Sequence, residues 1–252
     1  MITDIEIGRM VVLSDLHLGN PFCDQPRRIL RFLEWASEEG YDICINGDGL
    51  EISQLSFEHF SRDVPRLLRV LKRIADRGRR VYYVVGNHDM AMEHFLDDWG
   101  ALAVTPFLNL SSGHARIRIE HGHLYDPFFV NSPKLYEFST WIGGLVLSAM
   151  PGAYRLWVSF ERWRSRLRGP DAQGLLGEPP QFQAAAEEIA RRGFDVVVFG
   201  HTHHPGERGL PHGARYLNPG SWLLGTQFVR IEHGEVTLEE WSPQLAGSPG
   251  AA

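Results

Sequence analysis

The sequence has few cysteines and a deficit of positive charge. Two of its 252 residues are cysteines, Cys23 and Cys44, too few for a disulfide framework or for a zinc site built from thiolates. Lysine and arginine number 25 against 31 aspartates and glutamates, so the net charge is -6 at pH 7. This balance disfavours a long nucleic acid as partner, because binding to a phosphate backbone depends on basic residues. The cysteine content favours a reducing compartment.

The sequence also lacks the patterns of secretion and of membrane spanning. The first residues, 1–6, carry acids where a signal peptide has basic residues followed by an apolar run. The longest uncharged stretch, Phe138 to Tyr154, contains three glycines and a proline and falls short of the roughly 20 apolar residues that a spanning helix needs. We therefore expect a cytoplasmic protein that associates with the inner face of the membrane only peripherally.

The composition is that of a folded domain of ordinary kind. Hydrophobic residues make up 43% and charged residues 22% of the chain, close to the average of globular proteins. The length fits one large domain that carries an insertion. We predict a single domain over residues 1–241 and a disordered tail over residues 242–252, which are small, polar and include two prolines.

The hydrophobic pattern predicts a layered α/β fold. Residues 29–36 and 64–75 repeat apolar side chains at helical spacing, and they lie between short β-branched runs typical of buried strands. These runs are Met10–Ser14, Asp42–Asn46, Arg80–Val85 and Asp195–Phe199. The alternation of strand and helix predicts parallel strands. Alternating polar and apolar residues predict half-exposed strands at Arg116–Glu120, Ala214–Leu217, Gln227–Glu232 and Glu235–Trp241.

Five of the predicted strands are followed by carboxylate, imidazole or amide side chains. Singly, a short motif such as Gly-Asp is usually an ordinary turn, whereas two histidines after a strand have no structural purpose. The carboxyl ends of strands in an open α/β sheet form its ligand-binding crevice, so we expect the motifs to meet in one site. They are Asp15-Leu16-His17, Gly47-Asp48, Gly86-Asn87-His88-Asp89, His121-Gly122-His123 and Gly200-His201-Thr202-His203.

The residue types in these motifs are those of a metal site. Aspartate, histidine and asparagine ligands without thiolate suit manganese, iron, zinc, cobalt or nickel, and among these we expect manganese. The number of ligands is sufficient for two divalent ions. In two-metal hydrolases the ions lie about 3.5–4 Å apart and stabilise the attacking and leaving oxygens of a phosphoryl displacement.

Complete and in order, these motifs resemble those of the calcineurin-like metallophosphoesterase family, from about Met10 to Trp222 with the insertion excepted. The resemblance implies a four-layer sandwich of two β-sheets flanked by helices. It also implies a metal-activated hydroxide that attacks phosphorus, His88 facing the phosphoryl oxygens or the leaving group, and Asp89 orienting His88. The ligands that it implies are Asp15, His17, Asp48 and His203 for the first metal, and Asp48, Asn87, His121 and His201 for the second, with Asp48 as the bridge.

Within that family the chain is similar to the UDP-2,3-diacylglucosamine hydrolase subgroup of lipid A synthesis, through residues 14–19, 46–51 and 218–222. It departs from the subgroup at His88, where arginine is usual, and at His123, where aspartate is usual. The resemblance implies hydrolysis of a phosphodiester or pyrophosphate bond, in a nucleotide-linked lipid. The alternatives are a soluble phosphomonoesterase or cyclic-nucleotide phosphodiesterase, and a non-catalytic scaffold, which would lack some of the ligands.

Residues 126–180 interrupt the strand–helix rhythm and are rich in tryptophan, glycine, proline and arginine, which predicts an inserted helical cap. Within it, residues 154–168 hold five arginines and one glutamate, with apolar residues near helical spacing on the other side. Such a helix suits an anionic membrane surface, which residues 141–168 would contact. The alternative is a lid packed on the core with solvated arginines.

Overall fold

The structure, a computed structural model, describes residues 4–20, 23, 26–51, 57–100, 102–132, 134–135 and 178–242, with side chains in the second helix described from residue 64 onward. Most of the predicted cap, including all of residues 141–168, lies outside the described residues, as does the predicted tail from residue 243. None of the helices within the described part is long and apolar enough to cross a membrane.

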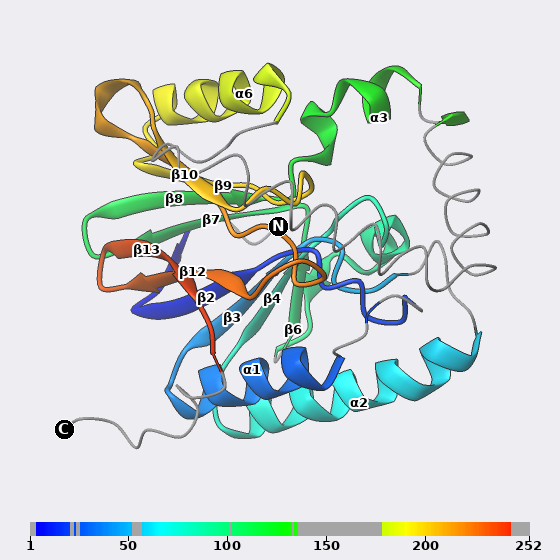
Figure 1. The fold of residues 1–252 in the computed structure, drawn as a ribbon. Helices are drawn as coiled ribbons and strands as arrows, with labels where there is room; N and C mark the ends of the chain where they lie inside the picture. Colours follow the sequence, from blue (N-terminus) through cyan, green and yellow to red (C-terminus); the bar gives the residue numbers. More distant parts are fainter. Residues whose placement is uncertain are drawn as a thin grey trace.

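Two β-sheets stack face to face between helices (Figure 1). The seven-stranded sheet has the order β13 (Glu235–Glu240), β12 (Gln227–Glu232), β2 (Arg9–Leu13), β3 (Asp42–Asn46), β4 (Val81–Val84), β6 (Leu102–Thr105) and β5 (Asp97–Asp98). The six-stranded sheet has the order β1 (Ile5–Glu6), β7 (Phe107–Ser112), β8 (Ala115–Glu120), β9 (Val196–Val198), β11 (Arg215–Asn218) and β10 (Gly206–Gly209).

Helices cover the outer face of each sheet, which completes four layers and confirms the predicted sandwich. Helices α1 (Pro26–Glu38) and α2 (Phe57–Asp76) pack on the seven-stranded sheet, and α6 (Pro180–Arg191) packs on the six-stranded one. The shorter helical elements are η1 (Met90–Phe95), η2 (His123–Tyr125), α3 (Pro127–Asn131) and η3 (Pro211–Gly213).

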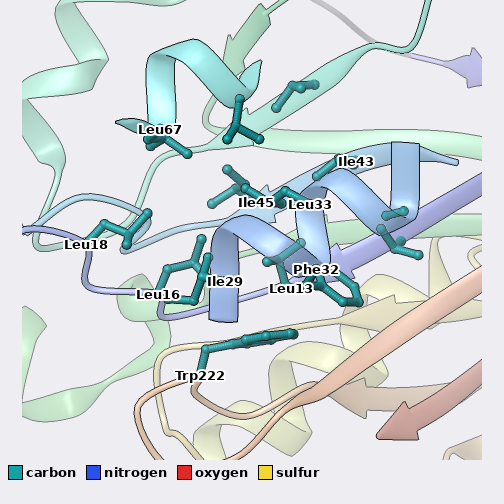
Figure 2. Packing of buried hydrophobic residues seen from close by; sticks show 14 of the residues in the cluster. Leu13, Leu16, Leu18, Ile29, Phe32, Leu33, Ile43, Ile45, Leu67 and Trp222 are labelled. Atoms are coloured by element: carbon teal, nitrogen blue, oxygen red, sulfur yellow. The ribbon is translucent and has the colours of Figure 1, made fainter. Parts of the chain in front are cut away.

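The core follows from the period of two along each strand. In β2, Val11 and Leu13 face the helices, whereas Met10 and Val12 face the other sheet, so both faces of the strand are buried and the sequence reads as a continuous apolar run. Figure 2 shows the helix-facing layer, where Phe32 of α1 lies among the side chains of the strands and Trp222. On the opposite side of the molecule, Phe182 of α6 packs in a separate cluster on the six-stranded sheet.

Parallel pairing brings the strand ends together. Strands β2, β3, β4 and β6 pair in parallel, as do β8, β9 and β11. The predicted strands are all present, with bounds shifted by at most one residue, and the predicted turn between Glu232 and Glu235 joins β12 to β13. The helical repeats at 29–36 and 64–75 lie within the longer helices α1 and α2. Strands β6 and β7 were missed. They are separated only by Pro106, yet they belong to different sheets, so the chain crosses between layers with no break in the sequence pattern to signal it.

Candidate metal centre

The loops that follow β2, β3, β4, β8 and β9 meet at one end of the sandwich. Their polar side chains form three groups in which one donor atom from each member lies within 4.8 Å of the others. The groups are Asp15, His17 and His203; Asp48, His121 and His201; and His17, Asp48 and His88. Residues more than 180 positions apart in the chain are therefore brought into one site, as the strand-end motifs predicted.

The first group surrounds a buried carboxylate oxygen. Oδ1 of Asp15 lies 3.1 Å from Nε2 of His203, and Nε2 of His17 lies 3.5 Å from the same nitrogen. Oδ1 of Asp15 is buried, and no hydrogen bond reaches it from the described residues. A buried carboxylate oxygen without a hydrogen bond destabilises the folded protein unless a positive charge nearby compensates it. A divalent cation between these three atoms would do so.

The second group also contains a buried carboxylate close to imidazole nitrogens. Oδ2 of Asp48 lies 3.3 Å from Nε2 of His121, and Oδ1 of Asn87 lies 3.2 Å from that nitrogen and 2.8 Å from Nδ1 of His201. The other ring nitrogen of His121 donates to the carbonyl of Asn46, at 2.9 Å, so Nε2 is the nitrogen that faces the group. Asn87 thus joins the two histidines, as expected for a shared ligand set.

Backbone strain is concentrated at the same residues. Five non-glycine positions here lie in the left-handed region, with φ of 54° at Asp15, 46° at His17, 50° at Asp48, 65° at His201 and 61° at His203. Each such residue costs about 1–3 kcal/mol and persists only where the surroundings enforce it. Strain of this kind clusters at functional sites, and here it coincides with the convergent donors.

Two glycines allow the loops to approach one another. A side chain at Gly86 would collide with the carboxylate of Asp48, and one at Gly200 would collide with the hydroxyl of Ser14 beside Asp15. These positions therefore need a residue without a β-carbon. The lack of space around the donor atoms therefore explains the glycines at positions 86 and 200.

The electrostatics favour ionised carboxylates. Burial acts to raise the pKa of Asp15, but the facing His203 and His121 outweigh it and lower the pKa to about 2. The pKa of Asp48 is likewise held well below its usual range, by His121 and His88 against the effect of burial. For His121, burial is outweighed by Asp48 and Asp15, which raise the pKa to about 10. Protons on imidazoles thus balance the carboxylates, and metal binding would displace such protons.

Glu51 occupies a position that sequence reasoning did not assign. It is fully buried, with Oε2 2.9 Å from Nδ1 of His17 and Oε1 2.8 Å from Nδ1 of His88. Both imidazoles are therefore oriented by one carboxylate, and both Nε2 atoms point toward the groups of donors. Glu51 follows Asp48 by three residues and belongs to residues 46–51, which resemble the hydrolase subgroup. This resemblance is the signal in the sequence that points to Glu51.

The expected role of Asp89 is wrong. Its carboxylate accepts hydrogen bonds from the backbone nitrogens of Gly86 and Gly49, at 2.6 and 3.0 Å, and from the hydroxyl of Tyr83. Burial, together with the charge of Asp48, raises its pKa to about 6. Asp89 therefore links the loop after β3 to the loop after β4, whereas Glu51 orients the imidazole of His88.

The side chain of His123 lies beside the site and forms no hydrogen bond with the described residues. It is buried, its Nδ1 has no partner among the described residues, and its ring packs edge-on against Phe129 at 5.1 Å. Burial and the neighbouring His121 and His201 lower its pKa to about 3. His123 is therefore a neutral packing residue beside His121 and His201, at the position where the resemblance to the subgroup implies an aspartate.

The donor set fits divalent cations. It combines carboxylate, imidazole and amide oxygen, and both cysteines are buried away from these groups, which matches metals of intermediate softness. The outer nitrogens of His17, His121 and His201 are each held by an oxygen, from Glu51, Asn46 and Asp126 respectively. Such partners fix the ring orientation that a metal needs.

Comparison with known proteins agrees with this geometry. The chain is similar to the UDP-2,3-diacylglucosamine hydrolase of Azotobacter vinelandii, with 26% identity over 251 residues, covering 94% of this chain and 95% of the relative. The enzyme of the same name from Ralstonia nicotianae is 25% identical over 255 residues, covering 92% of each chain. A hypothetical protein from Pyrococcus horikoshii OT3 shares the fold, with a TM-score of 0.50 and 13% identity over 95% of this chain and 91% of that one. A family model for calcineurin-like phosphoesterases matches residues 8–205, and the chain therefore belongs to this family of metal-dependent hydrolases.

Proposed function

We propose that this chain hydrolyses a phosphodiester or pyrophosphate bond with two divalent metal ions, manganese being the first choice. The main support for this proposal is that Asp48 belongs to two of the three groups of donor atoms. We assign Asp15, His17, Asp48 and His203 to one ion and Asp48, Asn87, His121 and His201 to the other. Two ions held there would lower the pKa of a bound water and neutralise charge on the phosphoryl oxygens.

His88 is placed to act on the substrate. Its backbone nitrogen donates to Oδ1 of Asp48 at 2.8 Å, and its Nε2 lies 4.0 Å from Oδ2 of the same residue. Burial is outweighed by Asp48 and Glu51, which raise the pKa of His88 to about 9. A protonated imidazole oriented in this way can donate to a phosphoryl oxygen or to the leaving group.

For the substrate we propose a nucleotide-linked lipid related to UDP-2,3-diacylglucosamine. Support comes from the curated relatives of that name, which match along more than nine-tenths of their length in both cases compared above. Peripheral contact with an anionic membrane through residues 141–168 would suit such a substrate. His88 favours a second candidate, a soluble phosphomonoester or cyclic nucleotide, because a titratable imidazole replaces the fixed two-pronged clamp that arginine offers to phosphate.

A product-resolved assay tests the proposal. Manganese-loaded protein is offered UDP-2,3-diacylglucosamine and bis(p-nitrophenyl) phosphate separately, with products identified by phosphorus NMR. We expect cleavage of the lipid to be much the faster reaction and to stop when a chelator removes the metal. Turnover of the soluble diester alone would transfer the assignment to the second candidate. Hydrolysis of neither compound by protein shown to hold two metal equivalents would contradict the proposed cleavage of a phosphodiester or pyrophosphate bond.

A further inference from the structure

Two acidic residues at the ends of the predicted insertion contact the same loop. Asp126 lies between η2 and α3, and Glu178 lies two residues before the start of α6. Oδ2 of Asp126 lies 2.9 Å from Nε2 of His201, and Glu178 accepts a hydrogen bond from the hydroxyl of Thr202. His201 and Thr202 belong to the loop after β9, which also carries His203. The two carboxylates therefore hold this loop from opposite ends of the insertion.

Asp126 determines which nitrogen of His201 faces the other donors. Because Nε2 donates its proton to Asp126, the lone pair belongs to Nδ1, which lies 2.8 Å from Oδ1 of Asn87. The ring also stacks on Phe182 of α6, with centroids 6.0 Å apart and planes at 16°. The imidazole is thereby fixed in both tautomer and orientation, which are the two properties that a metal ligand requires.

Glu178 ties the same loop to β11. Its carboxylate accepts from Nδ2 of Asn218 at 2.9 Å and from the hydroxyl of Tyr216 at 3.1 Å, while Nδ2 of Asn218 also contacts the carbonyl of Gly200 at 3.1 Å. The neighbouring His201 and His203 have left-handed backbones, a conformation that must be enforced from outside. The network around Glu178 provides that constraint.

We propose that Asp126 and Glu178 are positioning residues, which keep the His201–His203 loop in its metal-binding shape and make metal affinity depend on both ends of the insertion. The inference rests on the proposed function in one respect, namely that His201 and His203 bind metal. Neither acid is itself a member of the donor groups: Asp126 acts through the imidazole of His201, and Glu178 acts through Thr202 in the same loop.

Titration calorimetry of the metal-free protein with Mn²⁺ tests Asp126. Oδ1 of Asp126 also caps α3 by accepting from the backbone nitrogen of Phe128, at 2.9 Å. Serine is an effective helix cap but is too short to reach His201, so Asp126→Ser removes the histidine contact alone, whereas Asp126→Ala removes both. We expect both variants to lose about 10–100-fold in affinity at one metal site. Asp126→Asn, whose amide oxygen can still accept from Nε2, should recover most of the affinity.

Glu178→Ala completes the test, with Glu188→Ala on the exposed face of α6 as its control. Glu188 pairs with Arg191 and Arg192 of the same helix, so its variant should bind metal normally, while Glu178→Ala, which removes the acceptor for Thr202 and Asn218, should bind more weakly. Wild-type affinity in Asp126→Ser and Glu178→Ala, with two ions bound, would overturn this inference alone. Failure of the wild-type chain to bind any divalent ion would instead refute the proposed function.

A separate observation concerns the groove between α1 and α2. It encloses about 260 Å³, and its lining includes five arginines and one glutamate: Arg27, Arg31, Arg66, Arg69, Arg73 and Glu34. This concentration of positive charge occurs in a chain of net charge -6. Arg27 and Arg31 are four residues apart on α1, and so are Arg69 and Arg73 on α2. Like charges at this spacing on a helix repel one another.

The charge in the groove is balanced only in part. Arg73 pairs with Glu34, whereas Arg31 and Arg69 are exposed and form no ion pair with another side chain in the described part of the molecule. We infer that the groove binds a phosphate group, because guanidinium groups form paired, charge-assisted hydrogen bonds with phosphate oxygens. The phosphate could belong to a lipid headgroup or to a soluble anion.

Matched double variants distinguish these sources. Arg31→Gln with Arg69→Gln removes two charges from the groove, and Arg191→Gln with Arg192→Gln removes two from α6. Binding is measured to phosphatidylcholine vesicles with and without phosphatidylglycerol, and to pyrophosphate. Loss of about tenfold or more in the groove variant alone supports the site, with vesicles or pyrophosphate identifying the source. Equal effects of the two variants, or no effect of either, would overturn it.

Discussion

Asp48→Asn is expected to lower turnover by about 10³-fold or more, because metal ions contribute several kcal/mol to stabilising the transition state. Asp48 shares donor groups with His121 and His201 on one side and with His17 and His88 on the other. An asparagine has a similar shape but carries no charge, so it cannot compensate two cations. The measurement is the rate of hydrolysis with manganese in excess, together with the metal content by elemental analysis.

Asp42→Asn is the matched control for this variant. Asp42 is at the other end of the same strand, β3, where its carboxylate accepts from the backbone nitrogen of Arg80 at 2.9 Å. The change of charge is identical, and the metal content and the rate should remain close to those of the wild type. Near-normal activity in Asp48→Asn would overturn the assignment of two ions, whatever the result for Asp42→Asn.

The strand ends could be predicted because each carries a local signal. Asp48 comes two residues after a run of β-branched and apolar residues, and the same holds for Asp15 and its strand. Parallel pairing then requires such ends to meet at one edge. The convergence of the motifs thus depends on topology, which alternating strands and helices already indicate.

The supporting residues could not be predicted in the same way. Glu51 contacts histidines from two other loops, and Glu178 contacts Thr202 and Asn218. These contacts depend on loop conformations that are set by left-handed backbones at residues other than glycine, for which the sequence carries no signal. The sequence pattern identifies Asp126 only as the start of an insertion, although its carboxylate also contacts His201.

Asp89 shows how a motif can mislead. The family resemblance implies that Asp89 orients His88, yet neighbouring residues in a loop often point in different directions. Here Asp89 is fully buried beneath the loops, bonded to Tyr83 and to two backbone nitrogens. The acid that orients His88 is 37 positions away in the sequence.

His88→Ala is expected to lower the rate by about 10²–10⁴-fold, the range typical of a general acid or base, while leaving two metal equivalents in place. The imidazole is held by Glu51, and its Nε2 lies 4.0 Å from Oδ2 of Asp48, too far for a direct hydrogen bond between them. The measurements are single-turnover rates and elemental analysis of the same preparation.

His94→Ala, in the exposed part of η1, is the control and should match the wild type in both measurements. The structure also contains the alternative to be tested, because His17, Asp48 and His88 form a group of donors of their own. Loss of one metal equivalent in His88→Ala would place His88 among the ligands and remove it from proton transfer. Retention of both equivalents with a normal rate would instead exclude any contribution of His88 to the reaction.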